Sequence, residues 1–224
     1  TSPDANGARP TPLLIDRCTF ANGNGAAGRN ANFYNCVIAG CFGPGPAMIQ
    51  SGILVNCSVC CNSTAVSYGL SSADSYNCVF TMNGVSNAGG RDGNNPRYFA
   101  CAVAGAADVV TADPDCDLEA DPQAFFAPAF FDYRLLPGHT AIGLGKAEYL
   151  VKITVPDEDR YLDFNGNDIP AEGAIAAGAV QEIAPAPTSG AVWFGSEVEV
   201  DGIAGSTVSG WAYPESYPTQ FHVK

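Results

Sequence analysis

Asn35-Cys36-Val37-Ile38 is a motif that returns as Asn56-Cys57-Ser58-Val59 and again as Asn77-Cys78-Val79-Phe80. Looser copies centre on Cys18 and Cys101, and the five cysteines are separated by 18, 21, 21 and 23 residues. A motif that recurs about every 20 residues is typical of a solenoid, in which each repeat is one supersecondary unit stacked on the next. The spacing of this cysteine therefore decides the expected architecture.

The residues two places before and two places after each motif cysteine are mostly large and apolar. This alternation is typical of a strand with one buried face. The positions before it are Asp16, Tyr34, Val55, Tyr76 and Phe99, and those after it are Phe20, Ile38, Val59, Phe80 and Val103. Gly-, Asn- and Pro-rich clusters at 22–25, 43–46 and 89–96 turn the chain between motifs. About 20 residues with two or three short strands predict one coil of a parallel β-helix, since the Leu frame of a leucine-rich repeat and the length of helical repeats are both missing.

The Asn-Cys motifs resemble the rungs of right-handed parallel β-helix repeat proteins, of the kind secreted or surface-anchored by bacteria. In that family an inward Asn stacks as a ladder at a turn, and stacked amides can hydrogen-bond along the column. The resemblance implies an all-β fold of about five rungs with a structural ladder. Its predicted members are Cys18, Cys36, Cys57, Cys78, Cys101, Asn35, Asn56 and Asn77.

The later part of the chain is similar to the segment that closes many such proteins. Asp121-Pro122-Gln123-Ala124-Phe125, Asp132-Tyr133-Arg134-Leu135 and Asp163-Phe164-Asn165-Gly166-Asn167 follow the order of that pattern. His139-Thr140 stands where the family has Ser-Pro, and no Arg follows Asn167. The resemblance covers roughly residues 13–181.

The chain divides into five parts on these grounds. Residues 1–12 form an N-terminal arm, 13–106 the β-helix repeats, and 107–182 the closing segment. Residues 183–190 are a Pro- and Ala-rich linker. Residues 191–224 alternate like strands around an Asp-Gly turn and predict a β tail or an incomplete second β domain.

Composition excludes some partners. Lys and Arg total 10 against 23 Asp and Glu, a net charge of −13, so the clustered cations that bind nucleic acid or an anionic membrane are missing. No apolar run of about 18 residues predicts a membrane span, and no signal peptide is visible. Because Thr1 is not an initiator Met, we expect the chain to have been processed or cut from something longer. The resemblance to secreted or surface-anchored β-helix proteins implies a secreted or cell-surface location.

Four cysteines lie outside the motif, and three of them are candidates for a disulfide. Cys41 and Cys61 fall near the same place after their motif cysteines, on rungs expected about 4.8 Å apart. A Cys41–Cys60 or Cys41–Cys61 bond is therefore one prediction, and buried free thiols are the other. The Cys57-x-x-Cys60 spacing is typical of zinc sites, but it has no second pair or His nearby.

No cofactor is required by the sequence, although one segment is a candidate calcium loop. Asp163, Asn165 and Asn167 place oxygen ligands at alternate positions. The glycine comes too early for an EF-hand-like loop, so a tight Asn-Gly turn is the competing interpretation.

Catalytic groups are sparse in the repeats. Their cations are Arg17, Arg29, Arg91 and Arg97, and Asp74 and Asp92 are the acidic residues between 17 and 107. A β-helix lyase needs a base and cations on one face, and a glycosidase needs two or three carboxylates on neighbouring rungs.

We therefore predict a non-catalytic structural or adhesive module, an adhesin-like part of an extracellular bacterial protein. Its partners would be copies of itself, through the ends of the β-helix or the tail strand, or other surface proteins. It is also a candidate for carbohydrate binding, with Trp211 and Tyr213 stacking on sugar rings. The alternative is a fragment of a β-helix polysaccharide lyase or glycoside hydrolase.

Overall fold

The computed structural model describes residues 12–21, 23, 28–43, 47–64, 68–83, 96–104, 111–128, 131–185, 208–212 and 219–223. Strands make up nearly all of the regular structure in these ranges, and η2 (Ala147–Lys152) is a 3-10 helix. The prediction of an all-β chain is confirmed.

The largest sheet is parallel and takes at least one strand from each repeat. Its order is β1-β4-β7-β10-β12-β14, with β3 also paired to β7. The strands are β1 (Leu13–Asp16), β3 (Gly28–Arg29), β4 (Ala31–Tyr34), β7 (Ala47–Val55), β10 (Tyr68–Tyr76), β12 (Arg97–Phe99) and β14 (Thr111–Ala112). We call it the first sheet.

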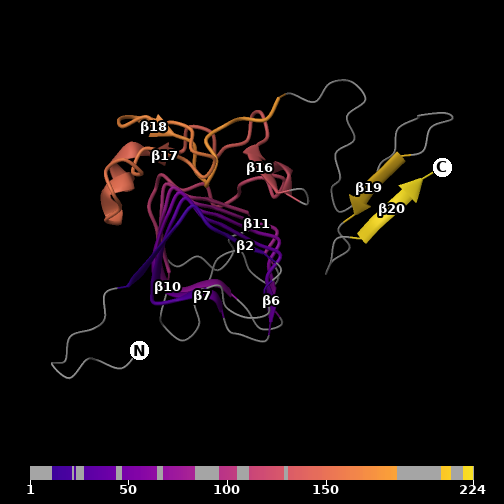
Figure 1. Ribbon diagram of the computed structural model, residues 1–224, viewed down its shortest axis with the longest axis horizontal. Coiled ribbons are helices and arrows are strands. Elements are labelled where there is room, and N and C mark those ends of the chain that lie inside the picture. The colour runs from indigo at the N-terminus through magenta and orange to yellow at the C-terminus, as the bar shows by residue number, and fades with distance from the viewer. Residues whose placement is uncertain are drawn as a thin grey trace.

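A second parallel sheet receives the strand that follows each motif cysteine. Its members are β2 (Thr19–Ala21), β5 (Val37–Ala39), β8 (Ser58–Cys60), β11 (Val79–Thr81) and β13 (Ala102–Val103), stacked in chain order. A third, two-stranded parallel sheet joins β6 (Phe42–Gly43) to β9 (Ser63–Thr64). Figure 1 shows successive turns of the chain lying on one another, with strands of the three sheets on different sides. Stacked parallel sheets of this kind are compatible with a β-solenoid, and the connections between turns lie partly outside the described residues.

The register predicted from the cysteine spacing is confirmed. In the first sheet, Asp16 pairs with Tyr34, Tyr34 with Val55, Val55 with Tyr76, and Tyr76 with Phe99. In the second sheet, Phe20, Ile38, Val59, Phe80 and Val103 pair in the same order. Each pair of rungs is therefore offset by the interval between their cysteines.

A left-handed residue turns the chain from the first sheet into the second. These residues are Arg17, Asn35, Asn56, Asn77 and Ala100, with φ between 46° and 52°. We call this the first turn. A second turn follows the second sheet, where Gly40, Cys61 and Met82 have φ of 63°, 56° and 50°. Such a residue interrupts strand alternation, so its own side chain points away from the core and the next one points inward.

The core between the sheets is apolar and fully packed. Phe33, Ile38, Leu54, Phe80 and the motif cysteines from 36 to 101 are completely buried in one cluster. Ring pairs link the rungs, with Phe20 edge-on to Phe33 at 5.7 Å and Phe80 edge-on to Tyr98 at 5.5 Å.

A sixth rung extends the five that the motif predicts. Ala102 forms a parallel bridge with Asp117, and Asp117 N donates to Cys101 O at 2.9 Å. Cys116 thereby takes the motif position, with Leu118 packed against the same core. The sequence interval of 15 residues from Cys101 to Cys116 is shorter than the others, which is why the spacing alone did not include it.

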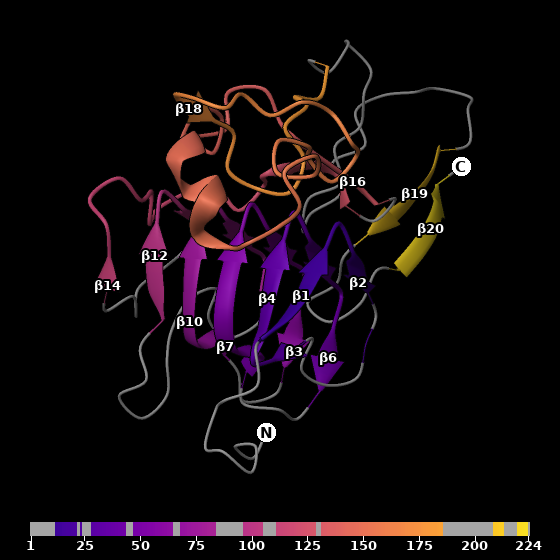
Figure 2. The same ribbon diagram turned by 60° about the vertical axis from the view of Figure 1, so that its left-hand side comes forward.

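Residues 131–185, which we call the cover, lie across one end of the first-sheet strands (Figure 2). The cover holds η2 and the antiparallel pair β17 (Gly145–Lys146) and β18 (Ala174–Ile175). Its β16 (Asp132–Leu135) pairs antiparallel with β15 (Phe125–Ala127). Apolar residues from both sides pack together, among them Tyr34, Val55 and Tyr76 of the first sheet with Leu150, Ile153 and Ile169 of the cover.

In the tail, β19 (Val208–Ala212) and β20 (Thr219–Val223) pair as an antiparallel hairpin.

Candidate functional site

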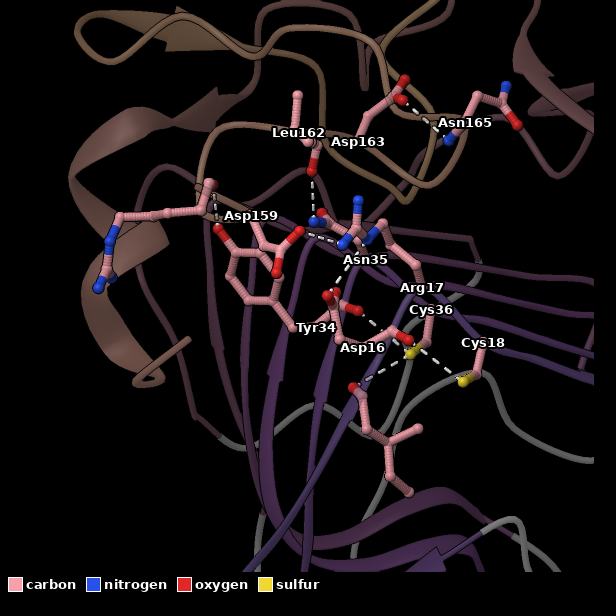
Figure 3. A network of polar contacts seen from close by, with 12 residues as sticks. Asp16, Arg17, Cys18, Tyr34, Asn35, Cys36, Asp159, Leu162, Asp163 and Asn165 are labelled. Carbon is pink, nitrogen blue, oxygen red and sulfur yellow. Dashed lines mark hydrogen bonds and ion pairs between the residues drawn. The ribbon is translucent and has the colours of Figure 1, made fainter. Parts of the chain in front are cut away.

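The cover meets the first turns of the rungs through asparagine side chains, a contact that we call the amide seam. Asn35 Nδ2 donates to Leu162 O at 2.6 Å, as Figure 3 shows. Asn77 Nδ2 donates to Lys146 O at 2.9 Å, and Lys146 N donates back to Asn77 Oδ1 at 2.8 Å. Both asparagines are fully buried. These amides therefore attach two rungs to backbone that lies far ahead in the sequence.

The backbone of the cover also approaches the rungs closely. Gly178 N donates to Asn77 O at 2.8 Å, and Ala179 N donates to Ser58 Oγ at 3.0 Å. Gly178 has a φ of 103°, and a Cβ there would lie 3.1 Å from Ser58 Oγ. A larger residue at this position would be strained and crowded, so the approach requires glycine.

In the middle of the amide seam, the side-chain polar atoms lack hydrogen-bond partners among the described residues. Asn56 is fully buried, and neither its Oδ1 nor its Nδ2 has a hydrogen-bond partner in the described part of the chain. Asn35 Oδ1 is in the same situation. A buried polar group without a partner costs about 1–3 kcal/mol, so the three asparagines of this column contribute unequally.

The predicted inward ladder of Asn35, Asn56 and Asn77 needs correction. In the structure the amides of Asn35 and Asn77 bond to the cover rather than to each other. Each of the three occupies the left-handed position of the first turn, so its side chain faces away from the core. The prediction rested on the resemblance to β-helix proteins in which an inward Asn stacks at a turn, and the left-handed backbone at this position turns the amide outward instead.

An inner amide ladder exists at the second turn instead. Asn62 Nδ2 donates to Asn83 Oδ1 at 2.9 Å, and Asn62 Oδ1 accepts from Cys41 N at 2.9 Å. The same amide groups donate to carbonyls of the second sheet, Asn62 to Ile38 at 2.9 Å and Asn83 to Val59 at 2.8 Å. Both asparagines lie five residues after a motif cysteine, so the 21-residue spacing contained this signal and sequence reasoning missed it.

Four of the five motif cysteines, Cys36, Cys57, Cys78 and Cys101, form a buried inward column, whereas Cys18 at the end of the stack is exposed. The backbone N–H groups of Cys57, Cys78 and Cys101 each donate to the sulfur of the next cysteine along, at 3.4 Å. Each thiol in turn donates to the carbonyl two residues before it, as in Cys78 to Tyr76 O at 3.1 Å. Burial, and then hydrogen bonding to the neighbouring thiol, raises the pKa of Cys78. The sulfurs therefore satisfy backbone N–H groups, and the raised pKa keeps the Cys78 thiol protonated.

The candidate disulfide residues are not arranged as their spacing suggested. All nine cysteines are free thiols. Cys60 pairs in register with Ala39, whereas Cys41 N bonds to Asn62 on the neighbouring rung. Cys61 occupies the left-handed position of the second turn. The predicted bond from Cys41 to Cys60 or Cys61 is not formed, because the three residues occupy different positions along their rungs.

The candidate calcium loop is organised around a buried carboxylate. Asp163 Oδ1 accepts from the backbone N–H groups of Asn165 and Asn167, and Oδ2 accepts from Gln181 N and from Asn167 Nδ2. Asp163 is fully buried. Four donors fill the acceptor capacity of a carboxylate, so a calcium ion would have to displace them. Through the bond from Gln181 N to Asp163, the loop joins residues 163–167 to Gln181 within the cover.

Charged groups that were considered for catalysis are held in ion pairs. Arg97 Nε donates to Asp74 Oδ1 at 2.7 Å across neighbouring strands, and Arg17 pairs with Asp16 and with Asp159 of the cover (Figure 3). Arg91 and Asp92 lie outside the described residues. The His139 ring contacts Asp121 O at 3.0 Å and accepts from Ala141 N at 3.1 Å, so both of its nitrogens bridge backbone groups.

Several aromatic rings gather where the first sheet meets η2. Tyr76 stacks on Phe99 at 4.6 Å and contacts Tyr149 at 5.2 Å. Lys152 Nζ lies 5.4 Å from the Tyr76 ring and 5.5 Å from the Tyr149 ring. These ring faces already contact a cation. For Trp211 the structure describes only the backbone, and Tyr213 lies outside the described residues, so stacking on sugar stays a prediction.

A hollow of about 710 Å³ opens beside this cluster. It is lined by Asp115 from the sixth rung, by Lys146 and Glu148, and by the backbone of Gly173 and Ala174. Lys146 forms an ion pair with Asp115 across it. Two carboxylates and an amine therefore share one concave surface here.

Comparison with protein-family models, curated proteins and solved structures gives no match. Within the described ranges, no three or more His, Cys, Asp or Glu side chains are grouped so that they could hold a metal ion. No helix in the same ranges is long and apolar enough to span a membrane.

Proposed function

We propose that this chain is a right-handed parallel β-helix that serves as a structural and adhesive module of an extracellular or cell-surface bacterial protein. It works without catalysis, by joining copies of itself edge to edge. The observation that carries the proposal is the outer edge of β1, which pairs with β4 on one side and with no other described strand. An edge strand presents unpaired backbone donors and acceptors to a partner.

The two ends of the stack differ, and the difference favours one contact. At the β1 end Leu13 is 67% exposed, and Cys18 and Thr19 are exposed as well. The other end carries Asp113, Asp115, Asp117 and Glu119, together with Pro114. Carboxylates and proline protect an edge against pairing. We therefore propose that β1 of one copy pairs antiparallel with β1 of a second copy, in a contact with two-fold symmetry.

Light scattering coupled to size-exclusion chromatography tests this contact. The chain should elute as a dimer, and Leu13→Lys should weaken dimerisation by about tenfold or more, because a charge would replace an apolar contact on each side. Val151→Lys is the matched control, since Val151 is an apolar residue on the cover that is 61% exposed. A monomer at all concentrations, or an equal effect of Val151→Lys, would contradict the proposal.

The hollow favours a second function, that of a polysaccharide-degrading or polysaccharide-binding fragment. Asp115 and Glu148 supply carboxylates and Lys146 supplies a cation, which are the groups such chemistry uses. Incubation with acidic and neutral glycans, followed by measurement of new reducing ends, separates the two functions. Cleavage that is lost in Glu148→Gln would establish the second function, and intact glycans would leave the structural module.

A further inference from the structure

The cysteine column ends at Cys116, which no motif marks in the sequence. Cys101 N donates to Cys116 Sγ at 3.4 Å, and the neighbouring residues Ala102 and Asp117 form a parallel bridge. Cys101 is completely buried, whereas Cys116 is partly exposed. The two thiols therefore form a stacked pair with one accessible member.

We propose that Cys101 and Cys116 are a redox-sensitive pair, which a small-molecule disulfide oxidises to an intramolecular disulfide that staples the sixth rung to the fifth. Rungs in register lie about 4.8 Å apart, inside the roughly 4.4–6.8 Å range of Cα separations that disulfides adopt. Both side chains already point into the same core.

The position at the end of the stack distinguishes this pair from the interior pairs. Cys57 and Cys78 are also neighbours, but both are completely buried and have rungs on either side. Beyond Cys116 no further strand is stacked among the described residues. The last rung can therefore shift by the small amount that a bond of about 2.0 Å between the sulfurs requires.

The reaction is two successive thiol–disulfide exchanges. The Cys116 thiolate attacks one sulfur of the reagent R–S–S–R, forms a Cys116–S–S–R bond, and releases one R–S⁻. The Cys101 thiolate then attacks Cys116 Sγ, closes the Cys101–Cys116 bond, and releases the second R–S⁻. Two protons leave the protein thiols, and the two electrons reduce the reagent to two thiols.

The surroundings of Cys116 select the charge of the reagent. Asp113, Asp117 and Glu119 are close in sequence on the same rung, and the charge of Asp115 is paired with Lys146. A local negative potential attracts cations and repels anions. The hydrogen bond with the Cys101 thiol, and then burial, raises the pKa of Cys116, so attack is slow at neutral pH. A cationic disulfide such as cystamine should therefore react faster than the anionic glutathione disulfide.

The experiment treats the full chain with cystamine or with glutathione disulfide and follows the products by mass spectrometry. We expect a product that has lost two hydrogens, with the bond mapped to the peptides of Cys101 and Cys116. Cystamine should react about tenfold faster at low salt, and the difference should shrink at about 1 M salt. The unfolding temperature should rise by roughly 5 °C and return to its original value with dithiothreitol.

Two single variants provide the controls. Cys116→Ser should abolish the product while keeping a hydrogen-bond acceptor for Cys101 N. Cys18→Ser changes the exposed thiol at the other end of the column and should leave the product unchanged. A bond mapped to Cys18–Cys36, a mixed disulfide at Cys116 that never closes, or an oxidised protein without a higher unfolding temperature would overturn the proposal.

Discussion

Two columns of asparagine run along this stack. The amides of one column face the cover, and those of the other face the core. At the first turn Asn56 precedes Cys57, and the asparagine faces the cover while the cysteine faces the core. At the second turn Cys61 precedes Asn62, and the asparagine faces the core while the cysteine occupies the left-handed position. The order within the pair decides which residue points inward. The position of the left-handed residue at a turn, rather than polarity, selects the side chain that points into the core.

The two columns also differ in how completely their amides are bonded. Asn62 and Asn83 bond to each other and to carbonyls of the second sheet, so the inner ladder depends on the stack alone. Asn35 and Asn77 depend on the cover, and Asn56 finds no partner in the described residues. The inner column should therefore contribute more to stability than the outer one.

Among the variants of the two columns, Asn62→Ala should lower the stability of the chain most. It removes the acceptor of Cys41 N and the donor to Ile38 O in a buried part of the core, at a cost of about 3 kcal/mol. The unfolding temperature should fall by roughly 10 °C, measured by circular dichroism. Asn165→Ala is the control, because Asn165 is exposed and uses its backbone N–H rather than its amide. Equal effects of the two variants would show that the inner ladder is not stabilising.

Asn77→Gly and Asn56→Gly measure how much a bonded and an unbonded amide of the outer column each contribute to stability. Glycine adopts the left-handed conformation without strain, so the pair of variants isolates the amide groups. Asn77→Gly should cost about 2 kcal/mol more than Asn56→Gly, because it leaves Lys146 N and Lys146 O without partners. Urea unfolding measures both free energies. If Asn56→Gly were the more damaging variant, the role assigned to the seam bonds of Asn77 would be wrong.

The smallest expected effect concerns the thiols and pH. Burial raises the folded-state pKa of Cys78 above the unfolded value of about 8.5, so the folded chain holds its proton where the unfolded chain releases it. The associated stability is complete below pH ~8.5 and is lost as pH rises, by about 1.4 kcal/mol per pH unit for one thiol. Cys78→Ser should reduce this alkaline slope in urea unfolding at several pH values. An unchanged slope would show that Cys78 does not contribute to it.

Sequence reasoning predicted the stack well because its period is a local property. Every rung carries its own copy of the cysteine, and parallel strands pair in the register that the copies define. The alternation around each cysteine correctly placed Val59 on the face that packs with the cysteines, but in the first sheet Phe33 takes that face and Tyr34 packs against the cover. It failed at the turns, because one left-handed residue reverses the alternation and the composition of a strand does not show where that residue lies.

The candidate sites were harder to predict because they join distant segments. Asp163, Asn165 and Asn167 have the composition of a calcium loop, but backbone N–H groups of 165, 167 and 181 converge on the Asp163 carboxylate. Neither the hollow around Asp115 and Lys146 nor the aromatic cluster around Tyr76 and Tyr149 corresponds to any sequence motif. Their members come from a rung and from the cover, which only folding brings together.

The all-β class, the repeat, the register and the inward column of cysteines could be predicted from the sequence, because each follows from side-chain size and spacing along one strand. The tertiary structure alone decided that Asn35 and Asn77 hold the cover, that Asn62 and Asn83 form the inner ladder, and that Cys116 completes the column. These outcomes depend on backbone conformation at single turn residues and on contacts between segments more than 60 residues apart, such as Asn77 with Lys146. The spacing of residues along the sequence shows neither the conformation of a turn residue nor a contact between distant segments.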